Sequence, residues 1–380
     1  MTKATLAIDA TNISAGGAVT HLMELCSQLT EIKHHFGEIY IFGPHQLESK
    51  LQLTPNINFI SHSWLSKNYL FRYLWLKFNF PKELKKRNVG LLFVPGGYYS
   101  GSFRPFVSMC RNMLVFDKNE RNRYGFSLMN ARLSLLNIFQ SQTFRKAAGL
   151  IFISNYAKNI VNQSLQLKNS TIIHHGVSKR FSLPIKKQLP IEQYNFNQPF
   201  KFLYVSIIDV YKHQDNVLKT IAALREKSYP VEITFIGGKY IPCYQRFISV
   251  YKDLGAQSFA NYLGEVPYTD LIQYYKNADA FIFASSCENM PNTLLEAMSS
   301  GLPIACSISN PMPEFLGEHG YYFDPEQIEN IYTALEKLLL EPQQRMRNAQ
   351  EAQLKAQDYN WKRCAQETMD YLWSIKANIE

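Results

Sequence analysis

The chain reads, from residue 280 to residue 306, AFIFASSCENMPNTLLEAMSSGLPIAC. Residues 280–283 are apolar and have the length of a buried strand, and residues 303–307 form a second such run. Pro291 suits the first turn of a helix and Gly301 suits its C-terminal cap, so we expect a helix over 291–300. A strand, a helix and another strand in this order predict a parallel sheet covered by helices.

The same alternation continues outward on both sides of this stretch. Short apolar runs that end at Gly, Pro or Ser alternate with longer segments of helical period. In the first half the predicted strands are 4–10, 38–42, 57–61, 90–94, 106–109, 149–153 and 171–174. In the second half they are 201–207, 232–236, 259–263, 280–283, 303–307 and 321–323. The sequence therefore predicts the α/β class, with a doubly wound, Rossmann-like sheet in each half.

A segment rich in Pro and polar residues, 184–199, separates the two halves. We therefore expect an N-terminal domain at 1–183 and a C-terminal domain at 200–359. The end of the chain is helical in pattern over 326–340, 342–357 and 360–376, and we expect 360–380 to pack back on the N-terminal domain. Because ligands bind beyond the carboxyl ends of parallel strands, the domains should face each other across a deep cleft that holds the site.

Charge is distributed unequally along the 380 residues. Residues 1–190 contain 24 Lys and Arg against 8 Asp and Glu, whereas the remainder contains 16 against 23, so the two parts carry +16 and −7. Opposite fields indicate that the two halves meet different partners. A hydrophobic content of 46%, with 18 Gly and 17 Pro, excludes fibrous, low-complexity and disordered classes.

The six cysteines form no CxxC pair and no cluster at metal-ligand spacing: Cys26, Cys110, Cys243, Cys287, Cys306 and Cys364. We therefore expect reduced thiols in a cytosolic protein, and no metal site. The sequence has no run of about 18 uncharged apolar residues, so no transmembrane helix is expected. The apolar stretch near residue 6 is too short for a signal peptide.

Two glutamates flank the start of the predicted helix. Glu288 lies on the preceding loop and could accept hydrogen bonds from sugar hydroxyls, and Glu296 lies inside the helix and could accept from both hydroxyls of a ribose. The backbone N–H groups of Asn292 and Thr293, in the first turn, would attract phosphate oxygens. For an isolated pair of glutamates, however, a helix cap and a surface residue are the ordinary interpretation.

The whole string resembles the signature of the retaining glycosyltransferases of the GT-B fold, family four, also called group one. Other stretches are similar to the same family, and they are 9–22, 172–177, 202–215, 231–238, 263–267, 310–314 and 320–325. The resemblance covers nearly all of the chain and is most specific over 279–324. It implies the transfer of a hexose from a nucleoside-diphosphate sugar.

The resemblance also implies roles for residues of the C-terminal half. Lys212 would contact the donor diphosphate as a point charge, with Gly237 and the N–H groups of Asn292 and Thr293 nearby. In the same way, Glu288 would hold hydroxyls of the donor sugar and Glu296 would hold the ribose.

In the N-terminal half, the resemblance assigns Gly16 and Gly17 to a loop whose backbone approaches the diphosphate when the cleft closes. A tight turn is the alternative explanation of these two glycines. The chain departs from the family at two places: Ile207 stands where an Arg is frequent, and Arg111 lies where a His is frequent. One hypothesis is that Arg111 supplies the missing second cation to the diphosphate, so that Lys212, Glu288 and Arg111 carry the catalysis.

Retaining members of this family are expected to need no enzymic nucleophile, because a donor phosphate oxygen takes the proton of the acceptor. Catalysis then consists of positioning and of stabilising the charge on the departing diphosphate. The sequence has no Asp-x-Asp, GxGxxG or GKS/T motif, so we expect no metal ion and no nicotinamide or P-loop chemistry.

Rings and cations interleave over residues 64–87 of the basic half. This pattern is typical of a segment at an anionic bilayer surface, but an amphipathic core helix with a solvated basic face explains it equally well. No nucleic-acid motif accompanies the charge, so nucleic acid is not an expected partner. Together with the resemblance, the pattern suggests a saccharide acceptor on a polyprenyl diphosphate, in bacterial lipopolysaccharide O-antigen or other surface-polysaccharide synthesis. The protein would be cytoplasmic and peripheral at the inner face of the plasma membrane.

Two other functions remain open. The chain could be a non-catalytic GT-B partner that recruits enzymes to a membrane, as the departures at Ile207 and Arg111 would allow. It could also be a GT-B nucleotide-sugar epimerase. The base and sugar of the donor, the acceptor sugar, the new linkage and the oligomeric state are not fixed by the sequence.

Overall fold

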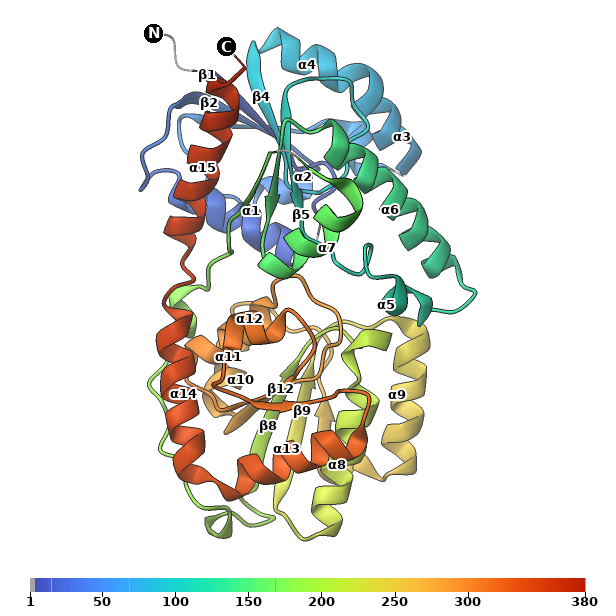
Figure 1. Cartoon of the computed structure of the whole chain (residues 1–380), viewed down its shortest axis with the longest axis vertical. Coiled ribbons are helices and arrows are strands. Elements are labelled where there is room, and N and C mark those ends of the chain that lie inside the picture. The colour runs from blue at the N-terminus through green and yellow to red at the C-terminus, as the bar shows by residue number, and fades with distance from the viewer. Residues whose placement is uncertain (1–3, 15, 68, 168, 380) are drawn as a thin grey trace. The chain divides into compact units, whose positions relative to one another are not determined.

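The computed structural model describes residues 4–14, 16–67, 69–167 and 169–379 (Figure 1). The chain forms two compact units, which we call unit 1 and unit 2. Unit 1 consists of Met1–Phe116, Phe126–Gly176 and Asn360–Glu380, and unit 2 consists of Asp117–Gly125 and Val177–Tyr359. These units differ from the expected domains in two places. The larger part of unit 2 begins at Val177, whose N–H donates to the carbonyl of Tyr359 at 3.0 Å, so the expected linker 184–199 lies inside this unit. Unit 2 also includes Asp117–Gly125, which lies within the expected N-terminal domain.

Over the described residues, seven parallel strands form the sheet of unit 1 in the order β3-β2-β1-β4-β5-β6-β7. Their bounds are β1 Ala4–Asp9, β2 Phe36–Phe42, β3 Ile57–Ile60, β4 Val89–Val94, β5 Phe106–Cys110, β6 Gly149–Phe152 and β7 Ser170–Ile172. In register, Ala7 of β1 lies opposite Tyr40 of β2 and Leu92 of β4. The order reverses between β1 and β4, so the predicted doubly wound sheet of the first half is confirmed.

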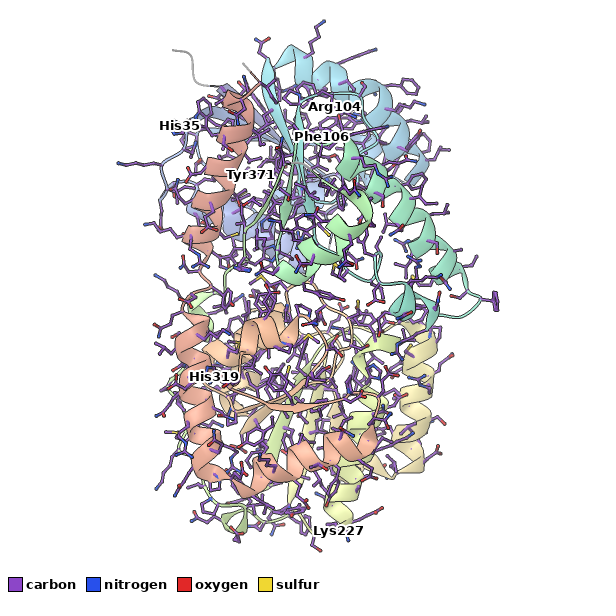
Figure 2. The ribbon with its side chains drawn as sticks, in the orientation of Figure 1. His35, Arg104, Phe106, Lys227, His319 and Tyr371 are labelled. Carbon is purple, nitrogen blue, oxygen red and sulfur yellow. The ribbon has the colours of Figure 1, made fainter. Side chains whose placement is uncertain are left out.

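The helices of unit 1 include the last helix of the chain, α15, which packs against α1. The ring of His35, just before β2, stacks on Trp373 of α15, with ring centroids 4.9 Å apart. Figure 2 labels His35 and also Tyr371, which belongs to α15. The bounds of these helices are α1 Gly17–Gln28, α2 His45–Glu48, η1 Ser63–Ser66, α3 Tyr69–Leu74, η2 Trp75–Asn79, α4 Phe80–Lys86, α6 Leu128–Lys146, α7 Asn155–Leu165 and α15 Trp361–Ala377.

The segment 64–87, with its alternating rings and cations, supplies part of the core of unit 1. Trp75, Phe80 and Leu84 are buried there, and the ring centroids of Phe42 and Phe80 lie 4.9 Å apart. The apolar side of this segment therefore packs against the sheet, as an amphipathic core helix would.

Over the described residues, unit 2 has a six-stranded sheet in the order β10-β9-β8-β11-β12-β13, and all its strands are parallel. The bounds are β8 Phe200–Val205, β9 Val231–Ile236, β10 Ala260–Tyr262, β11 Ala280–Phe283, β12 Ile304–Ser307 and β13 Tyr321–Phe323. The order reverses between β8 and β11, where Phe281 lies opposite Leu203. The doubly wound sheet predicted for the second half is also confirmed.

The helix predicted over 291–300 is α11, Asn292–Ser299. It ends where Gly301 adopts a φ of +64°, a left-handed conformation that suits glycine. The other helices of unit 2 are η3 Lys179–Phe181, η4 Ile191–Gln193, η5 Val210–Lys212, α5 Lys118–Asn122, α8 Gln214–Glu226, α9 Ile241–Asp253, η6 Ala256–Ser258, α10 Leu271–Asn277, α12 Met312–Leu316, α13 Ile328–Leu340 and α14 Pro342–Ala356. Within the described residues, no helix is both long and apolar enough to span a bilayer.

Candidate functional site

Two loops of unit 2 leave the carboxyl ends of the neighbouring strands β8 and β11. The strand order reverses at this pair, and such a switch point is where doubly wound sheets bind ligands. The loop after β8, which we call loop A, covers residues 206–213 and carries Lys212. The loop after β11, which we call loop B, covers residues 284–291 and carries Glu288.

Lys212 ends the short 3-10 turn η5 and is buried. The turn starts at Asp209, whose Oδ1 accepts from the N–H of Val210 at 2.8 Å. The hydroxyl of Tyr204, in β8, donates to the carbonyl of Lys212 at 2.6 Å. The backbone on both sides of Lys212 is therefore fixed by hydrogen bonds.

Lys212 and Glu288 form an ion pair between loops A and B. The ammonium Nζ of Lys212 donates to Oε1 of Glu288, and the two side chains are only 8% and 16% exposed. The same ammonium lies 4.9 Å from the ring centroid of Tyr211 and 5.3 Å from that of Phe283. Each side chain thus has a partner of opposite charge in a place with little water, where an unpaired charge is strongly disfavoured.

The N-terminus of α11 follows loop B directly. Its first hydrogen-bonded N–H groups are those of Leu294 and Leu295, which both donate to the carbonyl of Pro291. The N–H groups of Asn292 and Thr293 therefore precede the helical ladder, as those of a first helical turn do, and a helix N-terminus attracts anions.

Glu296 of α11 is buried, and two phenols hold its carboxylate. Tyr268 donates to Oε1 at 3.1 Å and Tyr275 donates to Oε2 at 3.0 Å. The guanidinium of Arg180 lies over the ring of Tyr268, 3.6 Å from its centroid. Burial raises the pKa of Glu296 to about 7, although both hydrogen bonds and the charge of Arg180 favour the charged form.

Gly237, which follows β9, lies against loop A. Its φ is +143°, and a Cβ at this position would meet the carbonyl oxygen of Ser206 at 2.2 Å. The N–H of Gly237 donates to the carbonyl of Gly264 at 2.8 Å. A glycine is therefore required here by close backbone packing.

Three predicted site residues belong to unit 1. Gly16, with a φ of +63°, precedes α1, and Gly17 is the first residue of that helix. Arg111 follows β5 and interacts electrostatically with His21 and Cys364; burial lowers its pKa to about 10. Thus Lys212 and Glu288 are in contact and Asn292, Thr293 and Glu296 share one helix, whereas Gly16, Gly17 and Arg111 lie in unit 1.

Several residues of this region were not among the predicted site residues. Tyr268, Tyr275 and Arg180 surround Glu296, and Glu120 and Tyr124 contact the loops from a distant part of the sequence. No local motif marks them. Tyr275 and Glu296 come together only through the fold, because α10 precedes β11 and α11 follows it.

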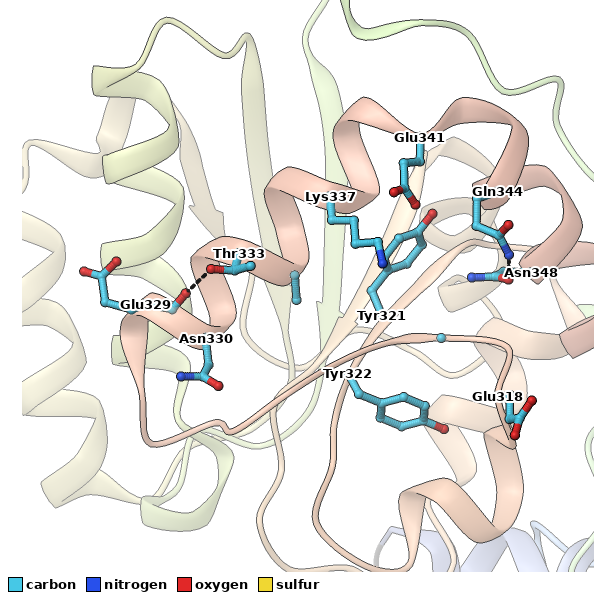
Figure 3. A pocket seen from close by; sticks show the side chains of 12 residues that line it. Glu318, Tyr321, Tyr322, Glu329, Asn330, Thr333, Lys337, Glu341, Gln344 and Asn348 are labelled. Atoms are coloured by element: carbon cyan, nitrogen blue, oxygen red, sulfur yellow. Dashed lines mark hydrogen bonds between the residues drawn. The ribbon is translucent and has the colours of Figure 1, made fainter.

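A cavity of about 480 Å³ in unit 2 contains none of the predicted residues (Figure 3). Lys337 and Thr333 line it from α13, and Tyr321 and Tyr322 line it from β13. Over the described residues, no group of three or more His, Cys, Asp or Glu side chains could hold a metal ion.

Comparison with known proteins gives a family for part of the chain. Residues 186–355 match the profile described as "Glycosyl transferases group 1". The chain is 30% identical over 114 residues to the O-antigen chain mannosyltransferase B of Escherichia coli, a match that covers 30% of each chain. It is 27% identical over 245 residues to the capsular polysaccharide biosynthesis glycosyltransferase CapH of Staphylococcus aureus, a match that covers 58% of this chain and 61% of that relative. The matches thus span less than two thirds of the length of these relatives.

The fold recurs in solved structures. The structure of Anabaena Alr3699/HepE in complex with UDP and glucose superposes with a TM-score of 0.71 at 14% identity, over 98% of this chain and 99% of that one. A structural likeness at this low identity shows that the two proteins share a fold. The chain therefore carries a domain of the glycosyl transferases group 1 family at residues 186–355, within a GT-B type fold of two doubly wound sheets.

Proposed function

We propose that the protein transfers a hexose from a nucleoside-diphosphate sugar to a saccharide acceptor, with retention of the anomeric configuration. The observation that carries this proposal is the largely buried Lys212–Glu288 pair at the β8/β11 switch point, with exposed fractions of 8% and 16%, inside the region that matches the family. A cation suits a diphosphate and a carboxylate suits sugar hydroxyls. The pair thus offers both chemistries side by side.

In the proposed complex, the donor diphosphate competes with Glu288 for the ammonium of Lys212. Glu288 then accepts hydrogen bonds from hydroxyls of the donor sugar. The N–H groups of Asn292 and Thr293 supply further donors to the diphosphate, because they precede the helical ladder of α11. Gly16, Gly17 and Arg111 are proposed contributors from unit 1.

Glu296 is the proposed ribose ligand. Each carboxylate oxygen has two acceptor sites, and the hydroxyls of Tyr268 and Tyr275 use one on each oxygen. One further site on each oxygen can accept from the two ribose hydroxyls. The tyrosines would then fix the carboxylate in the orientation that a pair of neighbouring hydroxyls requires.

The proposed chemistry needs no enzymic nucleophile. The acceptor oxygen forms a bond to the anomeric carbon on the face from which the diphosphate departs, the bond from that carbon to the diphosphate breaks, and the acceptor proton passes to a phosphate oxygen. Lys212 and the helix N–H groups stabilise the charge that develops on the diphosphate. We propose that this stabilisation suffices without a metal ion.

We further propose that the acceptor is a saccharide linked to polyprenyl diphosphate, in the synthesis of O-antigen or another bacterial surface polysaccharide. The names of the E. coli and S. aureus relatives support this assignment. The six cysteines are free and buried, as suits a reducing compartment, so we place the reaction at the cytoplasmic face of the plasma membrane.

The helix α6 of unit 1 offers the surface for this membrane contact. Its exposed side carries Leu128, Leu135 and Ile138, which are 91%, 54% and 51% exposed, and Phe126 before it is fully exposed. The sequence of the helix contains Arg and Lys but no Asp or Glu. An apolar stripe with basic flanks fits an anionic bilayer, where the side chains enter the lipid and the cations meet the headgroups.

Vesicle binding tests this membrane contact. The double substitution Leu135→Ser with Ile138→Ser should abolish sedimentation with vesicles that contain about 30% anionic lipid, and binding of the wild type should weaken as ionic strength rises. Leu70→Ser with Phe78→Ser, in the segment 64–87, is the matched control, because both side chains are exposed elsewhere in unit 1, on α3 and η2 respectively. Equal loss in both variants, or binding that is insensitive to salt, would contradict the assignment to α6.

A transfer assay tests the proposed reaction. The protein is incubated with sugar conjugates of UDP, GDP, dTDP, ADP and CMP and with lipid-linked acceptors, in EDTA, and the product linkage is read by NMR. We expect one donor to give a product of retained configuration, and Glu288→Gln to lower the rate by at least about 100-fold. A donor whose sugar is isomerised without transfer would favour the epimerase, and the absence of any product would favour the non-catalytic partner.

A further inference from the structure

A nine-residue stretch of unit 2, Asp117–Gly125, comes from the middle of the unit 1 sequence. We call it the excursion segment. Its neighbours Phe116 and Phe126 belong to unit 1, so the chain enters unit 2 here and returns. Asp117 caps the short helix α5 of the segment, with its Oδ1 accepting from the N–H of Glu120 at 3.0 Å.

The first contact of the excursion segment reaches loop A. The hydroxyl of Tyr124 donates to Oδ1 of Asp209 at 2.8 Å, and the Tyr124 ring meets the ring of Tyr240 edge-on, with centroids 5.6 Å apart. The same oxygen of Asp209 accepts from the N–H of Val210 and so starts the turn that ends at Lys212. Tyr124 therefore orients the carboxylate on which this turn is built.

The second contact reaches loop B. Glu120 is only 6% exposed; burial raises the pKa of its carboxyl, and the neighbouring side chain of Ser286 lowers it. Ser286 in turn joins the two loops: its N–H donates to the carbonyl of Tyr211 at 2.8 Å, and its Oγ lies 3.1 Å from Nε2 of His213. Glu120 thus lies beside the residue at which loop A and loop B meet.

The third contact fixes the excursion segment itself. The guanidinium of Arg123 binds Glu120 through Nε at 2.8 Å and also pairs with Glu326, which precedes α13. Through Arg123, the carboxylate of Glu120 is tied to a second element of unit 2. Charge-assisted contacts of this kind favour one orientation of the guanidinium between the two carboxylates.

We propose that Tyr124 and Glu120 are positioning residues that hold loops A and B in the arrangement that brings Lys212 and Glu288 together. The inference rests on the proposed function, since it gives this arrangement the task of binding the donor.

Hydrogen exchange of the full chain, without any ligand, tests the positioning directly. In Tyr124→Phe the ring stays and one hydroxyl is lost, so amide exchange should become faster in residues 206–213. In Glu120→Ala exchange should become faster in residues 284–291, and Glu120→Gln should restore most of the protection, because an amide oxygen can still accept from Arg123 and from a neighbouring hydroxyl. Tyr251→Phe is the matched control: Tyr251 donates to the carbonyl of Ala260 at 2.6 Å, away from both loops.

UDP affinity of the same variants, measured by calorimetry, completes the test. We expect Tyr124→Phe and Glu120→Ala to weaken binding about tenfold and Tyr251→Phe to leave it unchanged, at comparable losses of Tm. Unchanged exchange in both loops would overturn the positioning role, and so would unchanged affinity despite faster exchange. If exchange is faster but neither the wild type nor any variant binds UDP or the other nucleoside diphosphates, the loops are held as described and the proposed function is wrong.

Discussion

At the scale of residues, the central feature is a pair of opposite charges with little access to water. Lys212 and Glu288 are 8% and 16% exposed, so removal of either side chain would leave the other with little water around it. The same two side chains are proposed to bind the donor. The stability of the apo protein and its affinity for the donor therefore draw on the same two side chains.

The Lys212–Glu288 pair should show strong coupling in a double-mutant cycle. Lys212→Met and Glu288→Gln should each lower the free energy of unfolding by about 3 kcal/mol, because each leaves one uncompensated charge. The double variant should lose less than the sum of the single losses, with a coupling energy of about 1–3 kcal/mol. Urea denaturation of the four proteins measures this, and additive losses would show that the pair is not coupled.

Glu296 should make the stability depend on pH. Its pKa is raised from 4.5 to about 7, so between these values the folded state binds a proton that the unfolded state does not. The contribution of Glu296 to stability should therefore fall as pH rises through this window, by at most about 3 kcal/mol. Glu296→Gln should remove this slope. Denaturation at pH 5 and pH 8 checks it, and an identical slope in wild type and variant would refute the assignment.

The sequence could predict that these three side chains lie near the switch point, because each is in a local motif that follows one of its strands. Glu120 could not be identified in this way, because it is 166 residues away from Ser286 in the sequence. A lone Glu in a short polar helix has no pattern of its own. Glu120 comes near Ser286 only in the folded chain, where Asp117–Gly125 belongs to unit 2.

At the scale of elements, loop A is confined by its backbone neighbours as well as by side chains. Gly237 lies so close to Ser206 that no side chain fits between them. The resemblance alone predicted Gly237 near the diphosphate, and the structure supplies a packing reason for the same glycine.

Gly237→Ala should be more harmful than an alanine at another glycine of positive φ. Gly255, with a φ of +56° and open space where its Cβ would lie, is the matched control. Both variants should lose about 1 kcal/mol to backbone strain, and Gly237→Ala should lose about 1–3 kcal/mol more through the clash with Ser206. Urea midpoints with equal m-values measure the difference. Equal losses would mean that loop A moves away at little cost.

At the same scale, the predicted strands and helices were confirmed where apolar runs are bounded by Pro or Gly, as in α11. The role of the segment 64–87 is harder to predict from sequence, because one pattern of rings and cations fits both a core helix and a bilayer surface. Packing shows the core role of this segment, because Trp75 and Phe80 are buried against the sheet. Its contact with a bilayer remains a prediction, and α6 carries a second exposed apolar stripe.

At the scale of the whole molecule, each of the two units is assembled from stretches that are separate in the sequence. The last helix, α15, belongs to unit 1, and the excursion segment belongs to unit 2. Apolar periodicity predicted the two sheets because each strand carries its own pattern. It could not predict which unit owns Asp117–Gly125, since polar contacts such as Tyr124 to Asp209 decide that.

Core variants should separate the unfolding of the two units. Leu372 of α15 and Leu335 of α13 are both fully buried, in unit 1 and unit 2 respectively. Replacement of either by Ala should cost about 2–5 kcal/mol. In calorimetry with a bound nucleoside diphosphate, Leu335→Ala should lower the transition that the ligand stabilises, and Leu372→Ala should lower the other. The reverse assignment would contradict a donor site in unit 2.

The most direct test of the central claim is calorimetric titration of the protein in EDTA with UDP, GDP, dTDP, ADP and CMP. We expect one of them to bind, Lys212→Met to weaken that binding by at least about tenfold, and Lys227→Met, at an exposed lysine beyond the far end of α8, to leave it unchanged. Binding that Lys212→Met leaves intact, or that disappears in EDTA, would contradict a metal-independent donor site built on Lys212 and Glu288.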